Sequence, residues 1–100
     1  MMVKLVAVYR KPEDVEAFDK HYYEVHAPLV EKMPGLIKLE VNKIYGTPMG
    51  ESDLHLIANM YFESKEALLE ALSSSEGRAA GKDLRGFAGS IVTMHFAEVV

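Results

Sequence analysis

FDKHYYEVHAP, residues 18–28, is the stretch around which the remainder of the chain is organised. It places two histidines, two tyrosines and an acidic residue on one predicted helix. No other segment of the 100 residues is as dense in side chains that can exchange a proton. We therefore expect the rest of the chain to hold this helix against a sheet.

An apolar stripe predicts the helix. From about Glu13 onward, at about 100° per residue, the apolar side chains share one side: Val15, Phe18, Tyr22, Val25, Leu29 and Met33. His26 lies at one edge of this stripe, and His21 lies on the opposite flank. Pro34 and Gly35 end the helix.

Pro28 interrupts this helix before its end. A proline has no N–H to donate to the carbonyl of Glu24, and its ring crowds the preceding turn. We expect the helix either to kink at this point or to stop near Ala27 and restart. Either outcome loosens the backbone beside His26.

Four other segments show the alternation or the short apolar run typical of strands: residues 3–10, 36–45, 54–62 and 91–99. Ser64 is a plausible N-cap for a second helix, and a shorter helix or irregular turn is predicted over residues 76–87. The order is β-α-β-β-α-β, and right-handed crossovers place both helices on one face of a four-stranded antiparallel sheet. We expect an α+β fold, a ferredoxin-like plait, with residues 1–100 as a single domain.

The sheet face without helices carries a mixture of side chains. Its apolar members are Val6, Val8, Ile57 and Ile91, and its polar members are His55, Asn59, Tyr61, Thr93 and His95. Such a face is too apolar to remain in water and too polar for a simple core. We expect a homodimer in which the two helix-free sheet faces cover each other. The polar residues would then be hydrogen-bonded at the interface, or would line a polar lumen or second site.

The composition limits the partners. With 49% hydrophobic and 26% charged residues, the chain is globular in type. The net charge of -4 and the pI near 5.5 leave no basic footprint, so we expect neither nucleic acid nor a membrane as partner. The absence of cysteine excludes disulfides and thiolate chemistry. The apolar run at residues 5–9 is too short for a signal peptide, and we expect a cytoplasmic protein.

The helix pattern F-D-x-H-Y-x-x-x-H-x-P-L, residues 18–29, resembles the signature of EthD-domain proteins. Downstream segments are similar to that family as well: residues 59–62, residues 64–72, and Asp83, Leu84 and Phe87. The resemblance covers nearly the whole chain and implies a dimeric α+β barrel with a pocket between helices and sheet. It also implies a catalytic or accessory role in degrading small organic compounds. The wider superfamily includes cofactor-free monooxygenases, cyclases, isomerases and haem proteins, so the resemblance selects no single reaction.

His26 is the first catalytic candidate. An imidazole titrates near neutral pH, so it can accept or donate a proton on a substrate. Tyr22, one turn earlier, is the second candidate, because its hydroxyl can orient His26 or donate to an oxyanion. Tyr9, from the first strand, could supply another hydroxyl. The alternative is a histidine that binds only the free carbonyl of Glu24 or a nearby loop, with no ligand.

The ligand contacts that we expect come from aromatic and methionine side chains: Tyr9, Phe18, Tyr23, Met60 and Met94. Such a lining suits a small, apolar organic molecule, since methionine adapts to irregular shapes. His21 and His26 are five residues apart, whereas helical ligands of one metal are three or four apart, so we expect no metal. Residues 46–50 lack the lysine of a phosphate loop, and we expect no cofactor.

Two functions stay open at this level. The first is an enzyme that uses His26 as acid or base in a cofactor-free oxygenation, cyclisation, isomerisation or decarboxylation. The second is a non-catalytic homodimer that binds a hydrophobic ligand or accompanies an oxygenase system. A third, haem handling, rests on fold analogy alone.

Overall fold

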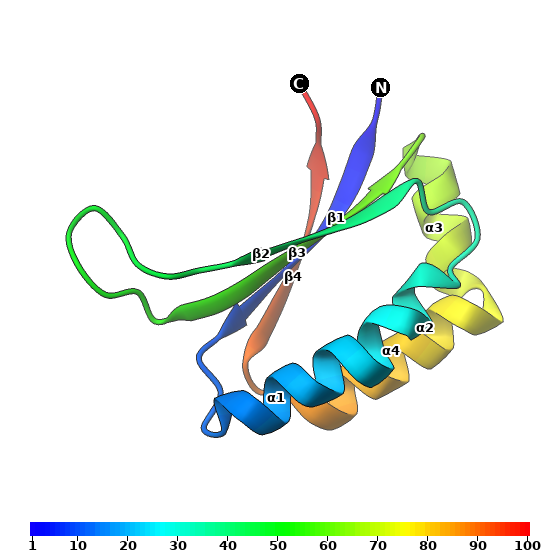
Figure 1. The fold of residues 1–100 in the computed structure, drawn as a ribbon. Coiled ribbons are helices and arrows are strands. Elements are labelled where there is room, and N and C mark those ends of the chain that lie inside the picture. The colour runs from blue at the N-terminus through cyan, green and yellow to red at the C-terminus, as the bar shows by residue number, and fades with distance from the viewer.

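The structure, a computed structural model, describes residues 1–100. Its helices and strands follow one another in the order β1 (Val3–Arg10), α1 (Val15–His21), η1 (Tyr22–His26), α2 (Ala27–Glu31), β2 (Lys38–Lys43), β3 (Leu54–Phe62), α3 (Lys65–Ser73), α4 (Ser75–Ala88) and β4 (Val92–Glu98). The strands form one sheet in the order β2-β3-β1-β4, and every neighbouring pair is antiparallel. All helices lie in one layer on one side of this sheet (Figure 1). The predicted ferredoxin-like α+β fold is confirmed.

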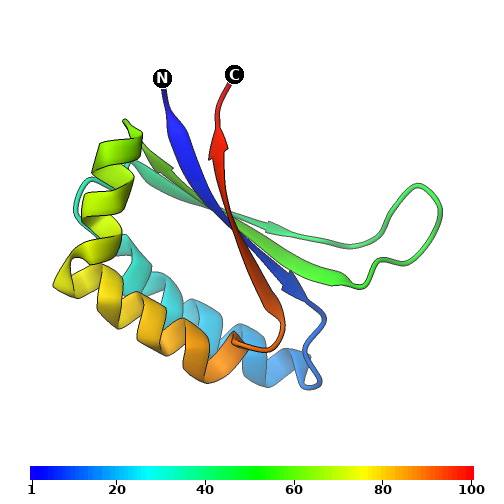
Figure 2. The same cartoon turned by 180° about the vertical axis from the view of Figure 1, so that it is seen from behind.

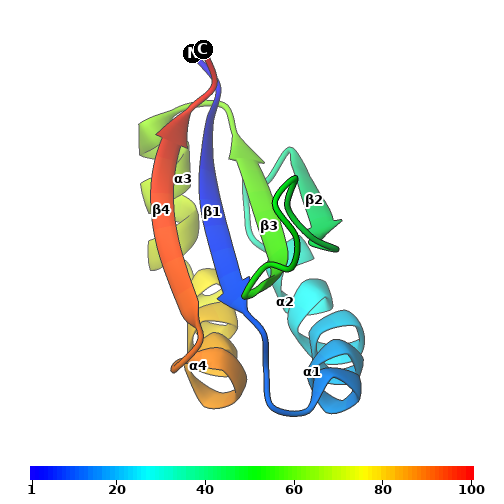
Figure 3. The same cartoon turned by 90° about the vertical axis from the view of Figure 1, so that its left-hand side faces the viewer.

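The same two layers are seen from behind in Figure 2. Figure 3 shows the four strands side by side, with β2 and β4 at the two edges. The chain ends lie together at one end of the sheet, where the Val99 N–H donates to the Met2 carbonyl at 2.9 Å. The loop between β2 and β3 projects beyond the layers at the opposite end (Figure 1). No helix of the structure has both the length and the apolar character needed to cross a membrane.

Side-chain caps fix where the helices begin. Asp14, Ser64 and Ser74 each accept a hydrogen bond, at 3.0 or 3.1 Å, from the backbone N–H three residues later. Each such cap contributes about 1 kcal/mol to the helix that follows. The cap at Ser64 was predicted. The structure differs from the prediction in the last helix. With the cap at Ser74, α4 is a regular helix of 14 residues, whereas a shorter helix or an irregular turn was predicted.

The first helix does not break at Pro28. Between α1 and α2 it makes one turn of π-helix, η1, in which the Ala27 N–H donates to the carbonyl of Tyr22, five residues earlier. Pro28 then lies in the first turn of α2, a position that tolerates proline. The chain therefore stays helical from Val15 to Glu31. The predicted stop and restart near Ala27 was wrong, because the wider turn accommodates the proline within a continuous helix.

The π-turn also moves the buried side of the helix. Phe18 and Tyr22 are buried as the apolar stripe predicts. Beyond the turn, however, the buried positions include His26 and Val30, while Val25 is 42% exposed. One extra residue in the turn shifts the inward side by one position. As a result His26 lies in the middle of the buried side, not at its edge.

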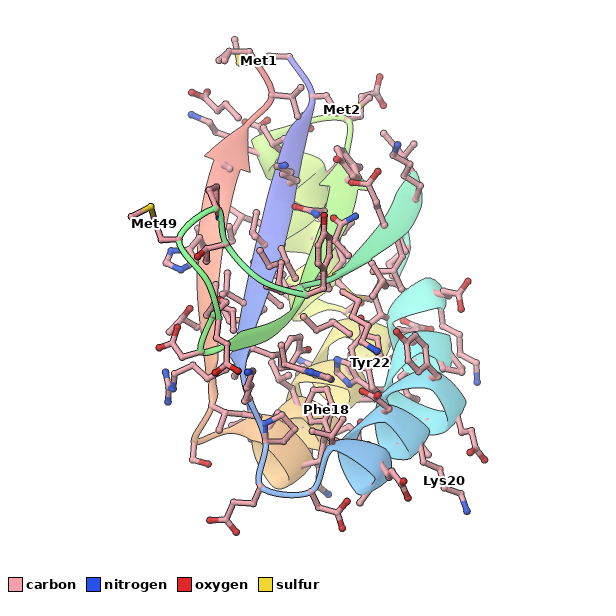
Figure 4. The ribbon with its side chains drawn as sticks, turned by 60° about the vertical axis from the view of Figure 1, so that its left-hand side comes forward. Met1, Met2, Phe18, Lys20, Tyr22 and Met49 are labelled. Atoms are coloured by element: carbon pink, nitrogen blue, oxygen red, sulfur yellow. The ribbon has the colours of Figure 1, made fainter.

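The core lies between the helices and the two central strands, β1 and β3. Inward residues alternate along β1 as Val3, Leu5, Ala7 and Tyr9, all at most 4% exposed. The edge strand β4 is covered less well, and Phe96, which the alternation predicts to face inward, is 68% exposed. Figure 4 shows Phe18 and Tyr22 directed into the layer between helix and sheet, with Lys20 pointing away from it.

Candidate functional site

His26, at the end of η1, is hydrogen-bonded to Asp83 in the middle of α4. Because a carboxylate only accepts, the His26 Nδ1–H donates to Asp83 Oδ2, at 3.0 Å. The side chain of His26 is 5% exposed and that of Asp83 is 18% exposed. The bond fixes the orientation of the ring and leaves Nε2 as the nitrogen with a free lone pair. An imidazole held in this way is arranged to accept a proton.

His21 binds the same carboxylate from the side of α1. Its Nε2–H donates to Asp83 Oδ1 at 2.8 Å and to Oδ2 at 3.0 Å. The predicted location of His21 across the helix from His26 was therefore wrong. In an α-helix, residues five apart differ by about 140° around the axis. In a π-turn, where N–H groups bond to carbonyls five residues back, such residues lie much closer to one line.

A cavity of about 60 Å³ lies beside His26, between the sheet and the helices. Ten of its thirteen lining residues are hydrophobic. Small residues of α4, namely Gly77, Ala80 and Gly81, leave this space open where larger side chains would fill it. Gly77 has a second reason to be small, since a Cβ there would lie 2.0 Å from the carbonyl oxygen of Ala71 on α3.

Two residues with ionisable side chains, Tyr9 and His26, line this cavity. No fully buried side-chain nitrogen or oxygen in the structure lacks a hydrogen-bond partner. His26 Nε2 and the Tyr9 hydroxyl make no hydrogen bond within the protein, so each must reach accessible space. Both residues are among those that line the cavity.

The residues predicted for the site are distributed over three places. Tyr9, His26, Met60 and Met94 line the cavity together. Tyr22 is 1% exposed and lies behind His26, with 5.6 Å between the ring centroids.

Phe18 lies in the same aromatic layer, 5.3 Å from the Tyr9 ring and 5.4 Å from the Phe87 ring. Tyr23 is 51% exposed and touches Tyr22 edge-on at the surface. The structure therefore does not bring Phe18, Tyr22 or Tyr23 to the cavity wall. Phe18 and Tyr22 instead support the residues that form it.

Asp83 and Phe87 of α4 are the residues to which the sequence assigned no role at the site. The Phe87 ring centroid lies 4.4 Å from that of His21 and 5.1 Å from that of His26, so this ring packs against both imidazoles. Residues four apart on a helix share a face. Phe87 is an apolar residue of α4, and Asp83 precedes it by four residues. This spacing was the feature of the sequence that could have placed the Asp83 carboxylate on the inward face of the helix.

Burial decides the protonation of the site. The pKa of His26 is lowered, first by burial of the ring and then by the charge of His21, although the bond to Asp83 acts in the opposite direction. Burial raises the pKa of Tyr9, and the neighbouring Tyr22 and Asp83 raise it further. The pKa of Tyr22 is raised in the same way, mainly by burial. At neutral pH the site thus holds a neutral imidazole and neutral phenols, and only the imidazole can serve as a base.

A second histidine–carboxylate pair connects α1 to β3. His55 Nε2–H donates to Asp19 Oδ1 at 2.7 Å, and the imidazole packs edge-on against Phe18. The prediction that His55 points to the helix-free face was wrong. Along β1, Tyr9 is opposite Leu56 and Arg10 is opposite Leu54, so His55 is the extra residue of a β-bulge. A bulge re-aims side chains, and this one turns His55 toward the helices.

A larger hollow lies elsewhere in the molecule. A groove of about 460 Å³ runs between α3 and the end of β4, lined by Leu68, Leu69 and Phe96 among others. Its only charged residues are Lys65 and Glu98, which pair with each other at 3.2 Å. The groove is larger, but no histidine or tyrosine lines it. The smaller cavity beside His26 is therefore the better candidate for a site of proton transfer. No group of three or more His, Asp or Glu side chains is arranged to hold a metal ion.

Comparison with known proteins identifies close relatives. The family model described as EthD domain matches residues 10–91. A Rhodococcus erythropolis protein, described as an uncharacterised 11.0 kDa protein in the thcB–thcC intergenic region, is 35% identical over 97 residues, which cover 97% of this chain and 94% of that protein. The crystal structure of an ethyl tert-butyl ether d (EthD) family protein from Bacillus halodurans is 48% identical, with a TM-score of 0.98 and coverage of 100% of both chains.

More distant structures share the fold. SnoaB, a cofactor-independent oxygenase from Streptomyces nogalater, is 13% identical with a TM-score of 0.72, over 98% of this chain and 92% of that one. A protein of unknown function from Bacteroides fragilis, described as dimeric and ferredoxin-like, is 18% identical with a TM-score of 0.69, over 98% and 96% of the two chains. At these identities the comparison establishes a common fold and nothing more.

Proposed function

The chain belongs to the EthD domain family, and from this premise we propose that it binds a small, largely apolar organic molecule beside His26 and removes a proton from it. His26 is the base, Asp83 orients its ring, and the neutral Tyr9 hydroxyl donates a hydrogen bond to an oxygen of the ligand. One observation carries this proposal. A buried imidazole has its Nδ1–H bound to a carboxylate and its Nε2 free beside an apolar cavity.

Proton removal is the step for which this arrangement is suited. Loss of a proton from a carbon next to a carbonyl group leaves an enolate, and isomerisation, cyclisation and oxygenation can each begin from that species. The raised pKa of Tyr9 keeps its hydroxyl protonated, so it can donate to the enolate oxygen. A neighbour of the same fold is described as a cofactor-independent oxygenase. That description supports chemistry that starts from the protein's own acid–base groups.

The cavity limits the ligand. Since one water occupies about 30 Å³ in the liquid, about 60 Å³ accommodates a ligand of only a few non-hydrogen atoms. Met60 and Met94 have flexible side chains, and Met94 is 41% exposed, so both can move aside for a somewhat larger molecule. Pockets for drug-sized ligands measure about 300–1,000 Å³. A haem therefore does not fit this cavity, and haem handling is not part of the proposal.

Hydrogen–deuterium exchange tests the proposal without knowledge of the natural substrate. Acetone and butanone, incubated with the protein in D2O, should exchange the hydrogens next to the carbonyl group faster than in buffer, as measured by ¹H NMR. The acceleration should be lost in His26→Gln and retained in Glu70→Gln, which changes an exposed residue on α3. Exchange that proceeds equally well in wild type and His26→Gln would exclude His26 as the base.

A non-catalytic ligand-binding protein is the second candidate. The hydrophobic character of most of the cavity wall favours it, because such a wall binds an apolar molecule without any reaction. The same ketones distinguish the two functions. Shifts of the Met60 and Met94 methyl signals with no accelerated exchange would favour binding alone.

We also propose that the protein is a homodimer whose helix-free sheet faces cover each other. Val6, Val8 and Ile57 on that face are only partly buried within one chain, and an apolar sheet face of this kind favours association. Neighbours of the same fold are described as dimeric. In sedimentation velocity, Val8→Asp should convert the dimer into a monomer, while Val15→Asp, at an exposed apolar position on α1, should not. A wild-type protein that sediments as a monomer would refute this assembly.

A further inference from the structure

We propose that His21 is a positioning residue for the base at His26, because it holds the shared Asp83 carboxylate from the solvent side and, when charged, competes with His26 for it. This inference rests on the proposed function only in calling His26 the base. The coupling between the two histidines stands on the geometry itself.

The geometry makes Asp83 the common partner of two imidazoles. His21 reaches both of its oxygens, at 2.8 and 3.0 Å, and His26 reaches Oδ2 at 3.0 Å. Oδ2 therefore accepts from both rings. The Phe87 ring packs against both imidazoles as well, with centroid distances of 4.4 and 5.1 Å. One aromatic ring thus borders both imidazoles beside the shared carboxylate.

The two histidines differ in their access to water. The side chain of His21 is 35% exposed, whereas that of His26 is 5% exposed. A proton from solvent therefore reaches His21 more readily than it reaches His26. One carboxylate neutralises one positive charge, and a second imidazolium beside it would be a poorly solvated, unpaired cation. A charged His21 therefore favours the neutral form of His26, which is the form that can accept a proton from a ligand.

Few other ionisable groups face this cluster. From β1 it is Tyr9, which lines the same cavity, and from η1 it is Tyr22, both of which remain protonated near neutral pH. From α1, Asp19 is bound to His55 instead. The only ionisable residue of α2 is Glu31, which acts on Tyr22. On α4 the charged residues nearest to Asp83 in sequence, Lys82 and Arg85, are exposed.

Histidine titrations followed by NMR test the coupling, with ¹⁵N-labelled imidazoles and no ligand. His21→Gln keeps a donor to Asp83 but carries no charge, so the titration midpoint of His26 should move to higher pH. His21→Arg carries a permanent charge and a fork of donors that matches a carboxylate, so the midpoint should move to lower pH than in wild type. Glu70→Gln, at an exposed position on α3, is the control and should leave the midpoint unchanged.

The two opposite shifts separate this role from simple packing. A substitution that merely loosened the contact between α1 and α4 would hydrate His26 and move its midpoint in the same direction in both variants. Shifts in one common direction, or no shift in either variant, would overturn the proposal. The titration needs no substrate, so its outcome is independent of the ketone exchange experiment. Opposite shifts without accelerated exchange would leave the coupling established and the proposed function refuted.

Discussion

Replacing Asp83 with alanine removes the acceptor of the His26 Nδ1–H without opening the core around it. Asp83 is the sole hydrogen-bond partner of His26, whose side chain is 5% exposed. In Asp83→Ala the ring would stay buried with its N–H unsatisfied. His21, with a side chain that is 35% exposed, would instead find water.

The magnitude follows from this difference between the two histidines. A buried donor that loses its partner costs about 1–3 kcal/mol, and the His21 contact adds little because it is partly solvated. Alanine is a better helix former than aspartate, by about 0.5 kcal/mol in the interior of α4. The net loss in the free energy of unfolding should be about 2 kcal/mol. For a domain of this size that corresponds to a Tm lower by about 8–16 °C.

Urea unfolding followed by circular dichroism measures this loss, at one fixed protein concentration so that any dimer contributes equally. Lys82→Ala is the control, since it changes an exposed residue next to Asp83 on the same helix and should shift stability by less than about 0.5 kcal/mol. The effect of Asp83→Ala should largely disappear in a His26→Phe background, which has no donor to orphan. An undiminished loss in that background, or no loss in the wild-type background, would refute the assigned role of Asp83.

Three further predictions concern the same layer. Because the pKa of His26 is lowered in the folded protein, the unfolded chain takes up the proton first, so the free energy of unfolding should fall as the pH decreases below about 6.5. Urea unfolding at several pH values should show a weaker pH dependence of stability in His26→Gln. An unchanged pH dependence in that variant would count against burial of this ring. The substitutions Gly77→Ala and Gly81→Ala should have opposite signs in thermal unfolding. At Gly77 the new methyl group would collide with a backbone carbonyl 2.0 Å away, whereas at Gly81 it meets only the Arg85 side chain at 3.5 Å and adds up to about 1 kcal/mol of helix stability. Asp19→Ala should cost about 1 kcal/mol through the lost bond to His55, and a neutral result in urea unfolding would show that the pair is fully solvated.

The sequence predicts the elements of this fold well because hydrophobic periodicity is a local signal. The strands at residues 3–10 and 54–62 and the cap at Ser64 appear where they were expected. The overall order of elements then leaves few possible topologies. The sheet order and the single helix layer follow from that.

The π-turn and the β-bulge were not predictable in the same way. Each inserts one residue into a regular repeat, and each therefore turns the following side chains to a different side. The π-turn brings His26 inward and His21 beside it, and the bulge directs His55 to Asp19. The role of Asp83 depends on its contact with His26, which lies 57 residues away in sequence. The periodicity of a single helix carries no information about such a distant contact.

The state of the His26 ring is the most direct test of this account. Long-range ¹H–¹⁵N correlation spectra of the ligand-free protein at pH 7 report which ring nitrogen carries the proton. The account predicts a neutral His26 with the proton on Nδ1, bound to Asp83, and a bare Nε2 at the cavity. A proton on Nε2, or a ring that is charged at this pH, would contradict it.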